Sequence, residues 1–93
     1  MNKQNVEQAI RWLQEMTDGE VGSVDKGPCS GQALICKLYN IGLEEYADLV
    51  GNTTMYDRWG GLEDFLGVPF IVAWNDSPLL GLTPRKSVIA HLQ

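Results

Sequence analysis

The sequence predicts a mainly α fold, a compact single-domain bundle of four to five short helices formed by residues 1–93. Three observations indicate this class. A chain of 93 residues has room for one small hydrophobic core. Apolar residues make up 44% and charged residues 20% of the chain, which is typical of a globular domain. Apolar side chains also recur at helical spacing near both ends.

Local signals predict two helices in the first half of the chain. The first is expected from Asn5 to Met16, with Gly19 as its stop. Its apolar positions, at helical spacing, are Val6, Ala9, Ile10, Leu13 and Met16. Residues 20–27 favour a loop. A second helix is expected to begin at Gly27–Ser30, because proline is tolerated in a first turn, and to break at Asn40–Gly42.

The middle of the chain predicts shorter helical pieces. An acidic helix is expected over Leu43–Val50, followed by a helical turn at Met55–Trp59. Gly60-Gly61 is expected to interrupt the helix at that point, since glycine weakens a helix interior. Leu62–Leu66 then resumes it.

The run Phe70–Trp74 is compatible with either a buried helical or a buried extended segment. Its only candidate strand partner is Val21–Val24, so a minor two-stranded element remains open. The last helix is signalled more clearly, because Thr83 is an N-cap residue and Pro84 suits the first helical position. Its apolar stripe is Val88, Ile89 and Leu92.

Charge and composition exclude several classes of function. The net charge of −5 disfavours direct nucleic-acid binding and membrane-surface binding. The longest apolar run has five residues, against about 20 for a membrane span, and the N-terminus lacks the pattern of a signal peptide. Cys29 and Cys36 would lie roughly 10 Å apart on one helix, too far for a disulfide. Two free thiols favour a reducing, cytoplasmic location.

Catalytic chemistry has one candidate set. Cys29 at a helix N-terminus would have a lowered thiol pKa and could act as the nucleophile. His91, the only histidine, could act as the base, and Asn75 or Asp76 could orient its ring. A small apolar Cys29 and a surface His91 explain the same residues, so we expect no catalytic residues. Metal ligands and phosphate-binding glycines lack the required spacing, and no metal or cofactor is expected.

Recognition is expected on three segments whose aromatic and charged residues have no burial pattern. The first is the turn at Trp59, the second an exposed Asn75-Asp76 loop, and the third the acidic helix. The expected partner-binding residues are Trp59, Asn75, Asp76, Glu44, Glu45 and Asp48. Trp12 and Trp74 are expected to be mainly core, with Trp59 the most exposed tryptophan. Arg85 opposes the dipole of the last helix, and we expect Asp76 to compensate it.

The order of these motifs resembles a small family of actinobacterial and phage proteins that carries a domain of unknown function. The matching segments are the amphipathic helix Val6–Met16, the Cys-x-x-Gly-Ala-Leu-like start Cys29–Leu34, the Trp-Asn-Asp string at Trp74–Pro78 and the Thr-capped helix Thr83–Leu92. In this chain the glycine of the second motif is displaced, and Leu79–Leu82 lengthens the link to the last helix. The resemblance implies the order of elements and no activity.

Three functions remain after these exclusions. The favoured one is a small acidic interaction protein, of the sort that phages and mobile elements use to bind and modulate a host protein, because Trp and Tyr are enriched at binding hot spots. The second is a cysteine-dependent enzyme built on Cys29 and His91. The third is an acidic nucleic-acid mimic, for which twelve acids offset by seven bases is a modest charge density.

Overall fold

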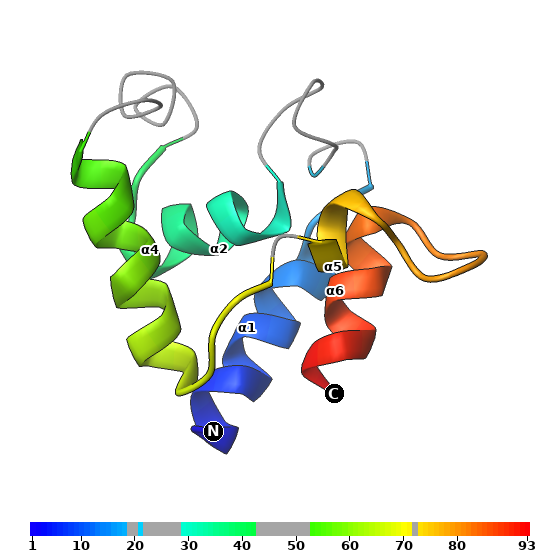
Figure 1. Ribbon diagram of the computed structural model, residues 1–93, viewed down its shortest axis with the longest axis horizontal. Helices are drawn as coiled ribbons and strands as arrows, with labels where there is room; N and C mark the ends of the chain where they lie inside the picture. The colour runs from blue at the N-terminus through cyan, green and yellow to red at the C-terminus, as the bar shows by residue number, and fades with distance from the viewer. Residues whose placement is uncertain (19–20, 22–28, 43–52, 72) are drawn as a thin grey trace.

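Five helices make up the described part of the chain in the computed structural model (Figure 1). The structure describes residues 1–18, 21, 29–42, 53–71 and 73–93, with the backbone alone at 53–56. The helices are α1 (Lys3–Glu15), α2 (Ser30–Leu38), α4 (Thr53–Leu66), α5 (Ala73–Asp76) and α6 (Pro84–Leu92). These elements confirm the mainly α prediction. None of the described helices combines the length and the hydrophobicity that crossing a membrane requires.

Helix α1 begins two residues before the expected start because Asn2 caps it. The Asn2 side chain accepts a hydrogen bond from the Asn5 amide at 3.2 Å, as N-cap residues do. The helix buries Val6, Ala9 and Leu13, the face that the apolar spacing predicts. It ends at Glu15, and the expected stop at Gly19 lies outside the described residues.

Helix α2 has the predicted start and the predicted break. Cys29 is its N-cap, and residues 27–28 lie outside the described part. At its end the Ile41 amide donates to the Cys36 carbonyl at 2.8 Å and the Asn40 amide to the Lys37 carbonyl at 3.4 Å. This bond pair is a Schellman motif, with Asn40 at φ 54° in the position that glycine usually takes. Asn40 therefore ends the helix, rather than Gly42.

Helix α4 runs without a break through Gly60 and Gly61, so the expected interruption is wrong. Gly60 faces open space, whereas a Cβ at Gly61 would collide with the phenol of Tyr39 on the neighbouring α2 segment. The Arg58 guanidinium lies 4.3 Å from the centre of the same Tyr39 ring. Tertiary packing of α4 against Tyr39 thus overrides the low helix propensity of two glycines. The acidic helix expected over Leu43–Val50 lies outside the described residues.

The run Phe70–Trp74 is neither one helix nor one strand. Phe70 is buried but Ile71 is 47% exposed, and α5 begins at Ala73. The expectation of a continuously buried segment is therefore wrong. No strand occurs within the described ranges, and Val21, the only described residue of the proposed partner segment, lies in a bend.

One core joins the four longer helices. Helix α1 contacts α2, α4 and α6, while α2 also contacts α4 and α6, and in Figure 1 α2 crosses between α4 and the α5–α6 pair. The buried cluster consists of Val6, Ala9, Leu13, Leu34, Ile35, Leu62, Leu66, Phe70, Val88, Ile89 and Leu92. Each of the four helices places apolar side chains in it, so loss of any one would expose the faces of the others.

The close approach of α2 to two aromatic rings gives a test of this packing. A methyl group at Gly31 would press against the Trp59 ring and lie 2.9 Å from Cε1 of Phe70. We expect Gly31→Ala to lower the free energy of unfolding by about 1–3 kcal/mol through overpacking. The matched control, Gly60→Ala on the open side of α4, should raise it by about 0.5–1 kcal/mol. Urea unfolding measures both, and a Gly31→Ala protein as stable as the wild type would contradict this account.

Candidate functional site

Asn75 is buried and structural, which corrects the prediction that it belongs to an exposed recognition loop. It lies in α5 with 1% of its surface exposed. Its Oδ1 accepts hydrogen bonds from both the backbone amide and the hydroxyl of Ser30, at 3.0 and 2.8 Å. Ser30 is itself buried at the first position of α2. The Asn75 side chain therefore satisfies an amide that has no partner inside its own helix.

Asp76 is the one expected partner-binding residue that the structure describes as exposed. Its Oδ1 accepts a hydrogen bond from Nδ2 of Asn75 at 3.3 Å. The residue is exposed, so its carboxylate lies at the surface. Glu44, Glu45 and Asp48 lie outside the described residues. The described part thus supplies one carboxylate to the expected acidic surface.

Trp59 packs into an aromatic row instead of forming an exposed turn. Ring centroids are 5.7 Å apart for Trp59 and Phe70, 5.3 Å for Phe70 and Trp74, and 5.2 Å for Trp74 and His91. Trp59 and Trp74 are both partly buried against the core, as is Trp12. The prediction of an exposed Trp59 turn fails because α4 does not bend at its glycines. The row joins α4 to α5 and α6.

The candidate thiol centre combines a buried cysteine with a histidine that stacks on an aromatic ring. Burial raises the pKa of the Cys29 thiol, against opposing hydrogen bonds from the backbone amides of Gln32 and Gly31. The expected lowering at a helix N-terminus is wrong, because desolvation outweighs the helix terminus. His91 stacks on Trp74, with the two ring planes 11° apart. Cys36, also a free buried cysteine, has its pKa raised by burial as well.

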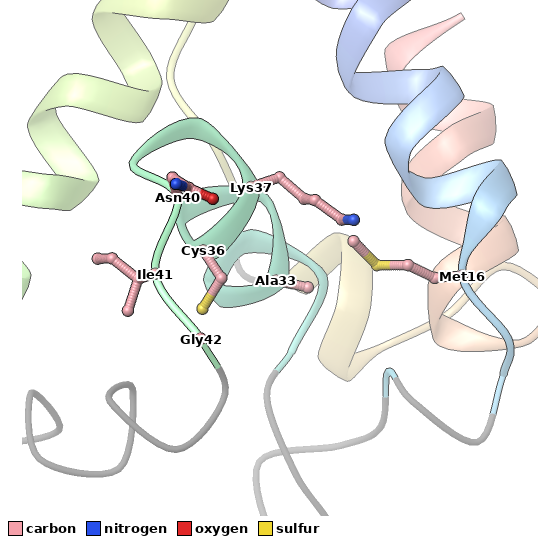
Figure 2. Close-up of a pocket in the computed structure, with 7 residues that line it drawn as sticks. All are labelled: Met16, Ala33, Cys36, Lys37, Asn40, Ile41 and Gly42. Carbon is pink, nitrogen blue, oxygen red and sulfur yellow. The ribbon is translucent and has the colours of Figure 1, made fainter.

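A pocket of about 300 Å³ lies between the end of α1 and the end of α2 (Figure 2). Its lining residues are Met16, Ala33, Cys36, Lys37, Asn40, Ile41 and Gly42. Figure 2 shows Met16 reaching from α1 toward Lys37 and Ala33 on α2. Its described lining is mainly apolar, with one amine from Lys37 and one amide from Asn40. Within the described ranges, no three His, Cys, Asp or Glu residues are grouped as metal ligands.

An exposed apolar turn between α5 and α6 was missed by the sequence prediction. Leu79 and Leu82 are 44% and 37% exposed, and Leu80 is fully exposed. The Leu82 amide donates to the Leu79 carbonyl at 2.9 Å, and Gly81 has φ +81°, the features of a type II turn. In Figure 1 this segment, coloured orange, projects away from the helices. We call residues 79–82 the leucine turn.

The sequence carried a signal for the leucine turn. Three leucines and a glycine stand between Pro78 and the Thr83 cap, in a stretch that belongs to no amphipathic helix or strand. Such leucines have no core face to join. A link of this composition predicts exposed apolar residues.

The leucine turn is fixed at both of its ends. The Leu79 amide donates to Oγ of the buried Ser87 on α6 at 3.1 Å. Thr83 caps α6 by accepting from the Lys86 amide, and its hydroxyl donates to Oδ1 of Asp18 at 2.9 Å. These bonds tie the turn to α6 and to the segment after α1.

Arg85 is compensated by Asp18 and not by Asp76, which corrects the sequence prediction. Its Nε lies 2.9 Å from Oδ1 of Asp18, and its Nη1 donates to the Leu13 carbonyl at 2.9 Å. The hydrogen bond from Thr83, followed by the hydrogen bond and charge of Arg85, lowers the pKa of Asp18 despite some desolvation. Arg85 thus binds both the last turn of α1 and the carboxylate beyond it.

Removing the buried side-chain carboxamide of Asn75 tests the structural role of this residue. Asn75→Ala leaves the amide and hydroxyl of Ser30 without their acceptor, at a cost of about 1–3 kcal/mol for each unpaired group. The matched control is Ser77→Ala at an exposed position one residue after α5, which should change stability by less than about 0.5 kcal/mol. Chemical denaturation compares the two. Equal stability of both variants would return Asn75 to the candidates for recognition.

The Asp18 contacts predict a pH dependence of stability with a definite sign. Because the folded-state pKa of Asp18 is lowered, its contribution is present above the unfolded pKa of about 3.9 and is lost as pH falls through the folded value. The difference in urea midpoint between the wild type and Asp18→Asn should therefore shrink as pH falls from neutral toward acid. A difference that stays constant over that range would show that the Asp18 charge adds nothing.

The chain matches no family model, no curated protein and no solved structure. The resemblance to the actinobacterial and phage family therefore stays a prediction.

Proposed function

We propose that the chain is a small acidic protein-interaction module, of the kind that phages and mobile elements encode to bind and modulate a host protein in the cytoplasm. The observation that carries the proposal is the leucine turn, which exposes three leucines of an acidic chain at one projecting point. Scattered exposed apolar residues are ordinary on protein surfaces, whereas a contiguous group marks an interaction site.

The exposure of Leu80 supports a role outside the fold. Burying a leucine side chain is worth about 1.5–3 kcal/mol, and a fully exposed Leu80 contributes none of that to folding. The same free energy becomes available when a partner covers the residue. Association with a partner would therefore bury apolar area that the leucine turn exposes.

Charge favours a partner with a basic or mixed patch, because Asp76 precedes the leucine turn while Arg85 and Lys86 follow it. The chain carries a net charge of −5, and Asp76 presents a carboxylate at the end of α5, three residues before the leucine turn. Opposite charge on a partner accelerates encounter, an effect that salt screens beyond about 8 Å at physiological ionic strength. Glu44, Glu45 and Asp48 would add to this field through their charge.

The alternative functions draw less support from the described residues. A cysteine-dependent enzyme needs a thiolate, and burial raises the pKa of Cys29. A nucleic-acid mimic needs a dense array of negative charge, and the described acids include Asp18, which is paired with Arg85. Neither alternative uses the exposed leucines.

A binding experiment with the full chain tests the proposal. Chemical crosslinking in the producing cell should identify a protein that, once purified, binds the immobilised chain saturably. Raising the NaCl concentration should slow association more than it changes dissociation, because screening acts on encounter. Asp76→Lys should also slow association, and Glu7→Lys, which makes the same charge change at an exposed position on α1, is the matched control. If no purified candidate binds saturably to the wild-type chain, the proposed function is wrong.

A further inference from the structure

An open groove of about 610 Å³ lies between α1 and the end of α4. In Figure 1 the end of α4 lies beside the first turns of α1, where the Asn2 amide donates to the Leu66 carbonyl at 2.9 Å. Helix α4 contributes Phe65 to the groove, and α1 contributes Gln4, Asn5, Glu7, Gln8, Arg11 and Trp12. The groove has the size of a small-molecule site, and its lining shares no residue with the leucine turn.

An aromatic platform is fixed in the groove by contacts between the two helices. The rings of Trp12 and Phe65 stack with their centroids 5.7 Å apart and their planes 20° from parallel. Both side chains are half-buried and pack against the hydrophobic core. Nδ2 of Asn5 donates to the Phe65 carbonyl at 2.9 Å and ties α1 to the same residue. The two rings therefore offer a rigid apolar surface, and a ligand that stacks on it orders few side chains on binding.

Polar side chains of α1 accompany this platform, and their charges cancel. Gln4, Gln8 and Arg11 are three or four residues apart and share one face of the helix. Nη2 of Arg11 donates to Oε1 of Gln8 at 3.1 Å, which leaves the Nε2 group of Gln8 to donate to a ligand. Glu7 supplies a carboxylate acceptor, and its negative charge offsets the positive charge of Arg11. The groove thus offers both donors and acceptors without favouring an ion.

We infer that this groove binds a neutral saccharide, with one sugar ring stacked on the Trp12–Phe65 platform. A sugar ring whose hydroxyls are equatorial exposes a flat face of C–H groups, and such a face packs on an aromatic ring. Each sugar hydroxyl both donates and accepts, so it can pair with carboxamide, carboxylate and guanidinium groups alike. The inference does not rest on the proposed function.

The distribution of polar groups separates a saccharide from other ligands. A nucleobase carries its hydrogen-bonding groups in one plane at its edge, so it uses few of the five polar side chains that line the groove. An acidic or basic peptide gains little electrostatic attraction from a lining in which Glu7 offsets Arg11. Because the groove is open, water competes for the same polar groups, and we expect a dissociation constant of about 1 mM.

An NMR titration of the full chain tests the inference, with the neutral sugars cellotetraose, maltotetraose and mannotetraose as probes. We expect at least one of them to shift the indole N–H signal of Trp12 and the amide signals of α1 saturably, with a Kd of about 1 mM. Adenosine serves as the planar, neutral comparison. If none of the sugars shifts these signals at about 10 mM, or if adenosine alone does so, the inference is wrong.

Two glutamines on α1 give a matched pair of variants. Gln8→Ala removes a hydrogen-bonding group from the groove and should raise the Kd about fivefold. Gln14→Ala makes the same change at an exposed position of α1 outside the groove, and its Kd should equal that of the wild type. Equal Kd values for the two variants would place the sugar elsewhere on the chain and overturn the inference.

Trp12→Leu tests the aromatic contact in a chain that keeps an apolar side chain against the core. Removing the ring should raise the Kd at least about tenfold, and the spread of the amide signals shows whether the variant is folded. A folded Trp12→Leu chain that binds as tightly as the wild type would contradict stacking on the platform. Leu80→Ala should leave the sugar titration unchanged, so failure of that titration leaves the proposed function standing.

Discussion

The hydrogen bonds from Ser30 to the Asn75 carboxamide are the contact on which the placement of α5, and of the chain that leaves it, depends. A helix of four residues such as α5 is too short to be stable alone. Asn75 fixes it to the start of α2, across 45 residues of sequence. Trp74 is thereby held between Phe70 and His91, and the chain leaves α5 at a defined point. The leucine turn begins from that point.

A second polar contact fixes the other side of the leucine turn. Arg85 and Thr83 both bind Asp18, so the start of α6 is attached to the segment that follows α1. Arg85 is largely buried in this contact while Asp18 stays partly in water, with 12% and 42% of their side chains exposed. A half-exposed ion pair of this kind contributes little free energy, while its hydrogen bonds fix the two segments relative to each other. Contacts with elements outside the turn therefore hold it in one shape. The conformational entropy of the turn is lost when the chain folds.

The sequence predicted those parts of the fold that local signals determine. The amphipathic face of α1, the Cys29 start of α2 and the Thr83 cap of α6 depend on residues within a few positions. The continuity of α4 and the burial of Asn75 depend on Tyr39 and Ser30, which are distant in sequence. Propensity alone therefore indicated a break and a loop. The leucine turn could have been predicted, because its leucines stand in a link that belongs to no amphipathic helix or strand.

Asn75 and Leu80 both depart from the usual relation between polarity and burial, and the difference between them indicates where function lies. Asn75 is polar and buried, but its carboxamide is hydrogen-bonded, so the cost of its desolvation is offset within the fold. Leu80 is apolar and fully exposed, and no hydrogen bond or apolar contact among the described residues offsets that exposure. A buried polar residue whose hydrogen bonds are made, such as Asn75, has a structural role. An apolar residue that the fold leaves exposed, such as Leu80, is expected at functional sites. The leucine turn that carries Leu80 is also held in a fixed shape. An exposed link without a function would not require that shape.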